Sequence, residues 1–325
     1  MKLLQLFLLS FFIPFILIST NQIYLSYGEE TKIDKKQSIF TTLRGDNSVF
    51  SVFTQEQWPA GPDMVYIDIT QDGQIILATS GGNNQTYIFN STNGEILAKV
   101  DVGEIPRGIK ISPDSTLALV ANEGSNSLSF IDIQNKTKIK EIEIGSTPHN
   151  IAFSLDGKTA YVTLQGEDKI AIVNTTSMDK IDEFSAGKLP HNLDISSDGK
   201  TLFVANIGSQ DVSVINLTNN EIIKSIPVGL GHHGIDVSPD GKVVYVAGIG
   251  SDKISVIDTS SLQVIKEIIV GKGPHGIRAS EDSKRVYVDV TSTNEIIVID
   301  ANNFEIIDKI STGDTPFWLA VKGNS

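Results

Sequence analysis

The feature that most constrains the fold is an internal repeat with a period of 42 residues. A glycine three residues before each repeat start recurs in every copy, and an aspartate eight residues after the start recurs in six copies. The repeats start at Met64, Pro106, Pro148, Pro190, His232, Pro274 and Pro316. Such regular spacing indicates one supersecondary unit used repeatedly, because a chain with unrelated domains would not preserve it.

Each repeat has the pattern of four short β-strands. In the unit that starts at His232, short runs rich in Val and Ile are separated by Asp-Gly, Gly-Ser and Ser-Ser turns. This pattern is typical of strands and contains no helical periodicity. Gly241 follows Asp240 at one turn, where glycine tolerates the positive φ of a tight hairpin. A four-stranded unit of this length is a β-propeller blade.

The two ends of the repeat region complement each other. The piece that starts at Pro316 holds only a first strand, and strand-like runs lie at 38–43 and 49–54 near the other end. Pairing the first and last strands of a propeller removes its exposed edges. We therefore predict an all-β, seven-bladed β-propeller whose last blade is closed by the N- and C-terminal strands. Because residues 31–37 are charged and make a poor strand, the closing blade is expected to have either three or four strands.

The first 28 residues have the composition of a targeting segment. Lys2 precedes a nearly uninterrupted apolar run over residues 3–18, and Ser26, Tyr27 and Gly28 place small residues near its end. A signal peptide over residues 1–28 is predicted, with an uncleaved membrane anchor as the alternative. The propeller domain then covers residues 29–325. We expect an exported protein in an extracellular, cell-surface or periplasm-like location, which contacts a membrane only through this segment and only if the segment stays uncleaved.

Composition excludes several classes of function. The formal net charge of −13 argues against nucleic acid as a partner, since phosphate binding needs basic patches. The absence of cysteine excludes disulfides, thiolate metal sites and a cysteine nucleophile. No zinc-protease motif or nucleophile elbow is present. These observations favour a binding protein over an enzyme. They do not identify the ligand or partner, which can be a protein, a glycan or a small molecule.

The repeat also resembles a known family. Four segments carry the likeness, namely FVAN at 203–206, YVTL at 161–164, SPDG at 238–241 and VIDT at 256–259. Together they resemble the YVTN family of β-propeller repeats over residues 64 to about 321, although the tetrapeptide Tyr-Val-Thr-Asn does not itself occur. The resemblance implies a secreted or surface-layer protein. It also implies similarity to cofactor-bearing propellers of redox enzymes, so fold alone does not choose between these functions.

The second position of each repeat is the candidate functional position. Residues there should form a ring around one end of the central channel, and four of the five histidines occupy it. In order the ring holds Val65, Arg107, His149, His191, His233, His275 and Phe317. With Trp318 at the next position, this end of the channel is predicted to combine imidazole, guanidinium and aromatic groups. The predicted ligand-binding residues are Arg107, His149, His191, His233, His275, Phe317 and Trp318.

Three interpretations of the histidines remain open. They are either repeat consensus residues held by a loop hydrogen bond, or donors and acceptors for an anionic or sugar-like ligand, or ligands of a transition metal. The sequence requires no cofactor. Blade spacing is expected to keep neighbouring Cα atoms apart, and no acidic residue at this position completes a metal site. The candidate metal ligands are His149, His191, His233 and His275.

Five Asn-x-Ser/Thr sequons are candidate glycosylation sites in an exported chain. They lie at Asn84, Asn90, Asn135, Asn174 and Asn216. Three of them occupy the end of the third strand of a repeat, on the face away from the histidines. We therefore expect any glycans to cover the far face and to leave the histidine end open. The alternative is that Asn and Asp interchange in these turns with no sugar attached.

Overall fold

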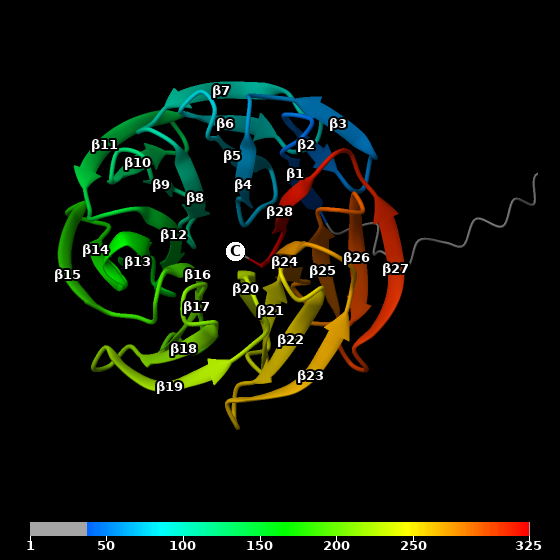
Figure 1. The fold of residues 1–325 in the computed structure, drawn as a ribbon. Coiled ribbons are helices and arrows are strands. Elements are labelled where there is room, and N and C mark those ends of the chain that lie inside the picture. The colour runs from blue at the N-terminus through cyan, green and yellow to red at the C-terminus, as the bar shows by residue number, and fades with distance from the viewer. Residues whose placement is uncertain (1–37, 325) are drawn as a thin grey trace, which may run out of the picture. The chain divides into compact units, whose positions relative to one another are not determined.

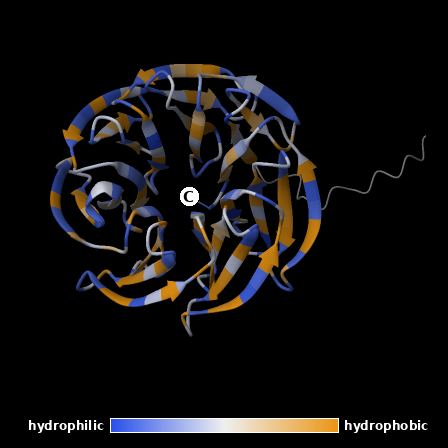
Figure 2. Ribbon diagram, in the orientation of Figure 1, coloured by the Kyte–Doolittle hydropathy of each residue, from blue (hydrophilic) through white to orange (hydrophobic). Residues whose placement is uncertain are grey.

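Short apolar strands between turn residues form seven four-stranded antiparallel sheets around a central channel (Figure 1). The computed structural model describes residues 38–324. Hydrophobic and hydrophilic residues alternate along the outer strands (Figure 2), as expected where one face of a strand packs inward. The predicted seven-bladed propeller with four strands per blade is confirmed.

The first six blades follow one another along the chain, and each blade begins with its innermost strand. Blade one consists of β4 (Met64–Ile69), β5 (Ile75–Ser80), β6 (Gln85–Asn90) and β7 (Ile96–Asp101). Blade two consists of β8 (Pro106–Ile111), β9 (Leu117–Asn122), β10 (Ser127–Asp132) and β11 (Thr137–Glu143). Blade three consists of β12 (Pro148–Phe153), β13 (Thr159–Leu164), β14 (Lys169–Asn174) and β15 (Asp179–Ser185), with the short helix η1 (Gln165–Glu167) after β13. Blade four consists of β16 (Pro190–Ile195), β17 (Thr201–Asn206), β18 (Asp211–Asn216) and β19 (Glu221–Pro227). Blade five consists of β20 (His232–Val237), β21 (Val243–Gly248), β22 (Lys253–Asp258) and β23 (Gln263–Ile269). Blade six consists of β24 (Pro274–Ala279), β25 (Arg285–Val290), β26 (Glu295–Asp300) and β27 (Glu305–Ser311).

The seventh blade is shared between the two ends of the chain. Its strand order is β28 (Pro316–Val321), β1 (Ile39–Leu43), β2 (Ser48–Ser51) and β3 (Glu56–Pro59). The pairing of Phe40 with Ala320 joins the first strand to the last. The predicted closure by N- and C-terminal strands is thus confirmed.

The sequence left the strand number of this blade open, and the structure gives four. The fourth strand, β3, was not predicted because its sequence, EQWP, lacks alternation and ends in proline. Its Trp58 is buried and packs against Phe40, with ring centroids 5.5 Å apart. Tertiary packing of one aromatic side chain therefore explains a strand with weak local propensity.

The predicted strand at 49–54 is shorter than expected, since β2 ends at Ser51. The charged segment 31–37, the signal peptide and the alternative membrane anchor lie outside the described residues. Between residues 38 and 324, the structure contains no helix long and apolar enough to span a membrane.

An irregularity in each of the six continuous blades directs side chains toward the channel. In β12, Pro148 lies opposite Leu164 whereas Ile151 lies opposite Val162, so the register shifts by one residue between them. The same shift follows the first residue of every inner strand from β4 to β24. A β-bulge at this point reorients the side chains at the second and third positions. Proline at the strand start has no N–H to donate, which suits a strand with a neighbour on one side only.

Aspartate side chains on the inner strands join consecutive blades. Asp194 accepts a hydrogen bond from the backbone N–H of Val237 at 2.7 Å, and Asp236 accepts one from Ala279 at 2.7 Å. Each acceptor and its donor lie 43 residues apart, so they belong to neighbouring blades. These contacts fix the inner strands relative to one another and so fix the positions of the side chains that surround the channel.

We predict that Gly234→Ala destabilises the propeller. A Cβ at this third position of β20 would lie 2.3 Å from the backbone oxygen of His275 in the next blade. Because backbone atoms cannot move aside easily, overpacking here should cost about 1–3 kcal/mol or more. Urea unfolding of both proteins measures the difference.

Gly81→Ala is the matched control for this substitution. Its Cβ would come within 2.7 Å of Oδ2 of Asp63, and a shift of this surface side chain costs no more than its partly exposed ion pair with Arg44, about 0–1 kcal/mol. Equal unfolding midpoints for the two alanine variants would show that the blades do not approach as closely at Gly234 as the structure indicates.

Candidate functional site

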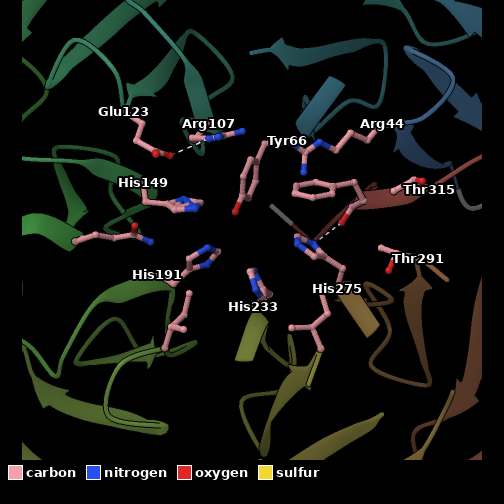
Figure 3. Close-up of a pocket in the computed structure, with 14 residues that line it drawn as sticks. Arg44, Tyr66, Arg107, Glu123, His149, His191, His233, His275, Thr291 and Thr315 are labelled. Atoms are coloured by element: carbon pink, nitrogen blue, oxygen red, sulfur yellow. Dashed lines mark hydrogen bonds and ion pairs between the residues drawn. The ribbon is translucent and has the colours of Figure 1, made fainter. Parts of the chain in front are cut away.

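The bulges place the second-position side chains around a cavity of about 450 Å³ at one end of the channel (Figure 3). We call this cavity the channel mouth. Its lining residues are Arg44, Tyr66, Arg107, Glu123, His149, Gln165, His191, Ile207, His233, Ile249, His275, Thr291, Thr315 and Phe317. The structure thus brings together six of the seven predicted ligand-binding residues.

The seventh predicted residue, Trp318, does not line the channel mouth. Its ring is buried and packs against Tyr66, with centroids 4.6 Å apart. Val65, at the second position of the first repeat, is fully buried and is also absent from the lining. In this first blade the third-position residue, Tyr66, reaches the cavity instead.

The four imidazoles contact one another in chain order. Ring centroids lie 3.7 Å apart between His149 and His191, 4.5 Å between His191 and His233, and 4.6 Å between His233 and His275. The row continues to Phe317, whose ring centroid is 3.8 Å from that of His275. Figure 3 shows the imidazoles pointing toward the centre of the mouth. The side chains therefore converge although they come from four separate blades.

A buried amide network lies among these rings. Asn150 donates its side-chain N–H to Oδ1 of Asn192, and the hydroxyl of Tyr66 donates to the same oxygen at 3.4 Å. The Nδ2 group of Asn192 donates to the backbone oxygen of His233. Because a carbonyl can only accept, this contact fixes which end of the Asn192 amide carries the hydrogens.

The network determines the tautomers of two histidines. Nδ2 of Asn192 also lies 2.8 Å from Nδ1 of His191, so that nitrogen must accept and the proton of this imidazole is on Nε2. In His275 the arrangement is reversed, because Nδ1 lies 2.8 Å from the backbone oxygen of Phe317 and must donate. The Nε2 atom of His275 therefore carries a lone pair. The two imidazoles offer a donor and an acceptor respectively.

The charged groups of the channel mouth are paired. Arg44 Nε lies 2.5 Å from Asp63 Oδ1, and Arg107 Nε lies 2.8 Å from Glu123 Oε2. A second nitrogen of Arg107 lies 3.6 Å from the other oxygen of Asp63. Two guanidinium groups are thus balanced by two carboxylates.

Three of the four imidazoles, those of His149, His191 and His275, are uncharged near neutral pH. Burial, and to a smaller extent the charge of Arg107, lowers the pKa of His149 to about 3. Burial lowers the pKa of His191 and that of His275 well below the usual value, and the neighbouring imidazoles add to the effect. Burial also raises the pKa of Tyr66, so its hydroxyl remains a donor. These groups therefore act through neutral hydrogen bonds.

A second set of lining residues was missed in the sequence. Five of its members directly follow the second strand of their blades, where they retain the 42-residue spacing, but their chemical diversity conceals the pattern. They are Glu123, Gln165, Ile207, Ile249 and Thr291. Arg44 holds the same place in the closing blade, directly after its second strand β1. It does not keep the 42-residue spacing to the others, so only the tertiary structure places it here.

The arrangement does not form a metal site among the described side chains. Within residues 38–324, no group of three or more His, Asp or Glu side chains is placed so that it could hold a metal ion. The metal interpretation of the four histidines stays a prediction for direct elemental analysis.

The sequons fall on both faces of the propeller. Asn90, Asn174 and Asn216 end third strands, and Asn135 follows one, which places all four on the far face. Asn84 lies instead in the turn between β5 and β6, on the face of the channel mouth, where its Oδ1 accepts from the N–H of Ile105 at 3.0 Å. The expected confinement of all five sequons to the far face is therefore wrong for Asn84. Glycosylation itself stays a prediction.

Fold and site together define a class of protein, a seven-bladed β-propeller with a polar and aromatic cavity at one end of its channel. Comparisons of the sequence with protein families agree with the fold. Residues 191–285 match the family described as YNCE-like beta-propeller, and residues 138–222 match the family described as lactonase, 7-bladed beta-propeller. Each match covers less than half of the chain, so it supports the fold and assigns no activity. No curated protein matches the sequence significantly.

Solved structures show the same architecture at low sequence identity. Hydrazine synthase from Kuenenia stuttgartiensis is 21% identical with a TM-score of 0.73, over 80% of this chain and 90% of that one. A functionally unknown protein from Desulfotomaculum acetoxidans is 17% identical with a TM-score of 0.77, over 89% and 99%. Dihydro-heme d1 dehydrogenase NirN, in complex with DHE, is 15% identical with a TM-score of 0.68, over 91% and 77%. At these identities the likeness concerns the fold alone.

Proposed function

We propose that the protein is an exported binding module that holds a small molecule in the channel mouth. The observation that carries the proposal is His149, which is 6% exposed and whose Nδ1 has no hydrogen-bond partner among the described residues. A buried polar atom without a partner is costly, so such an atom is more typical of a binding or functional site than of a structural core. The cavity volume of about 450 Å³ is within the usual range of small-molecule sites.

Export and a location outside the cytoplasm are part of the proposal. They are supported by the apolar run over residues 3–18 and by the small residues that follow it. The resemblance to YVTN repeats supports a cell-surface or surface-layer setting. Binding in the channel mouth is compatible with each of these locations, since the site needs only access to solvent.

Binding is favoured over catalysis by the state of the polar groups. An efficient general base has a pKa near the working pH, whereas burial holds the pKa of His149 at about 3. The carboxylate of Glu123 is engaged with Arg107 at 2.8 Å. The channel mouth is thus suited to hold a ligand by hydrogen bonds and aromatic contacts.

We predict that Gln165→Trp abolishes ligand binding without unfolding the protein. Gln165 lines the channel mouth and makes no hydrogen bond to the imidazoles, so a tryptophan there would fill the cavity. Screening a library of small polar molecules by thermal shift with the full-length protein should give compounds that raise its melting temperature. Each true ligand of the channel mouth should lose this effect in the variant.

Gln134→Trp is the matched control, because Gln134 is exposed on the far face and the same substitution there leaves the cavity open. Hits that persist in Gln165→Trp, or a library without hits, would contradict the proposal.

Elemental analysis of protein purified without a histidine tag provides a further test. Stoichiometric transition metal that disappears when His149, His191, His233 and His275 become alanine would replace this proposal with a metalloprotein function.

A further inference from the structure

The two assigned tautomers restrict the chemistry of the ligand. His191 offers an N–H from Nε2, whereas His275 offers a lone pair from Nε2. An anion only accepts hydrogen bonds and would face the lone pair of His275 unfavourably. A cation would face the N–H of His191 in the same way. A hydroxyl both donates and accepts, so it can satisfy either imidazole.

The charge balance of the channel mouth leads to the same class of ligand. Arg44 and Arg107 are each paired with a carboxylate, that of Asp63 and that of Glu123 respectively. An anionic ligand would share a guanidinium with this carboxylate and would be repelled by it. The two charges of each pair largely cancel for a ligand in the cavity, so the site offers little net attraction to charge of either sign.

Blades four and five add two aliphatic side chains to the channel mouth, beside their histidines. Ile207 and Ile249 line it on blades four and five, across the channel from blade one (Figure 1). Leu189 and Leu230 lie beside these residues, because their carbonyls accept hydrogen bonds from the backbone N–H groups of Ile207 and Gly250 at 3.1 Å. These leucines are 47% and 54% exposed. The ligand therefore meets aliphatic side chains on this side, which would cover an apolar substituent.

The opposite side presents aromatic faces next to the polar groups. Phe317 and Tyr66 meet edge to face with centroids 6.0 Å apart, and both line the cavity. Aromatic rings pack well against the C–H groups of a saturated ring, which has no charge to desolvate. A saturated ring with several hydroxyls would use this surface and the imidazoles at the same time.

We propose that the channel mouth binds an uncharged, hydroxyl-rich ring that carries an apolar substituent, that is, an aryl or alkyl glycoside. The proposal rests on the proposed function and names its ligand class. The hydroxyls contact His191 and His275, and the substituent lies against Ile207 and Ile249.

The experiment compares paired ligands by titration calorimetry with the full-length protein. The probes are the phenyl and methyl glycosides of glucose, galactose and mannose, with citrate and sulfate as anions. For at least one sugar, the phenyl glycoside should bind about tenfold more tightly than the methyl glycoside, because its ring is buried against the isoleucines. Citrate and sulfate should bind more weakly than that pair, and Gln165→Trp should abolish binding of both glycosides.

Ile207→Gln should remove the preference for the phenyl glycoside by weakening its binding about tenfold, because the phenyl ring would lose its apolar contact. The control is Ile222→Gln in the same blade, because Ile222 is 41% exposed on the outer strand β19 and should affect neither ligand. An anion or a library compound of other chemistry that binds the mouth while all six glycosides fail would overturn this inference and leave the proposed function standing. Failure of every probe and of the library would overturn both.

Discussion

Removal of residues 316–325 should prevent the protein from forming a stable propeller. These residues include β28, the innermost strand of the closing blade and the partner of β1. Leu319 and Val321 are fully buried in this strand and Trp318 is 2% exposed. The deletion would take this apolar surface from the core and leave the edge of β1 unpaired, which invites aggregation.

Circular dichroism and size-exclusion chromatography test this expectation. The truncated protein should lose cooperative urea unfolding and should elute as aggregates. Leu319→Ala is the graded version and should lower the free energy of unfolding by about 2–5 kcal/mol. Leu155→Ala is its control, since Leu155 is 54% exposed on the far face and should change stability by no more than about 0.5 kcal/mol. A truncated protein that unfolds at the wild-type urea concentration would show that the terminal strand does not close the ring.

Lowering the pH should lower the free energy of unfolding, because His149 is buried as an uncharged imidazole in the folded protein. Burial lowers the pKa of His149 to about 3 in the folded protein, whereas an unfolded chain exposes this imidazole with the ordinary pKa of 6.5. Between these values the unfolded state binds one more proton, so folding stability falls as the pH falls. The substitution His149→Gln removes the imidazole that takes up this proton. Relative to wild type, the free energy of unfolding of the variant should therefore rise by about 1.4 kcal/mol per unit as the pH drops from 6 to 4.

Asp236→Asn should show the opposite trend and serves as the control. Burial, reinforced by the charge of Asp194 and opposed by Arg278, raises the pKa of Asp236 to about 7. The folded state then keeps a proton that the unfolded state releases, so this group costs stability as the pH rises from 4 to 7. The variant should gain stability over wild type in that direction. Urea unfolding at several pH values measures both slopes, and parallel curves for wild type and His149→Gln would contradict the assignment of a buried, neutral imidazole.

The success of sequence analysis at the candidate site follows from the repeat. Because the 42-residue spacing places equivalent residues at equivalent points of the blades, Arg107, Phe317 and the four histidines could be assigned to one ring. The same spacing contains Glu123 and Thr291, but no shared chemistry drew attention to that position. Arg44 enters the site from the N-terminal part of the closing blade, which does not keep this spacing, so it could not be found in this way.

The contact between imidazoles could not be derived from the sequence either. Periodicity gives the order of residues around the channel, whereas the β-bulge after the first residue of each inner strand turns the side chains inward. As a result His149 and His191 lie with ring centroids 3.7 Å apart, and Asn192 sets the tautomer of His191. These effects arise between blades and leave no signal within one repeat.

The sequence by itself determined the seven-bladed architecture, the closure by both ends of the chain and the histidine ring, because all three follow from a constant repeat length and alternating apolar residues. Only the tertiary structure decided the fourth strand of the closing blade, the tautomers of His191 and His275, and the pairing of Arg44 with Asp63. The physical reason is the range of the interactions. Strand and turn preferences act over a few residues and repeat with the sequence, whereas burial, charge pairing and hydrogen-bond direction depend on neighbours that the fold brings together from distant parts of the chain.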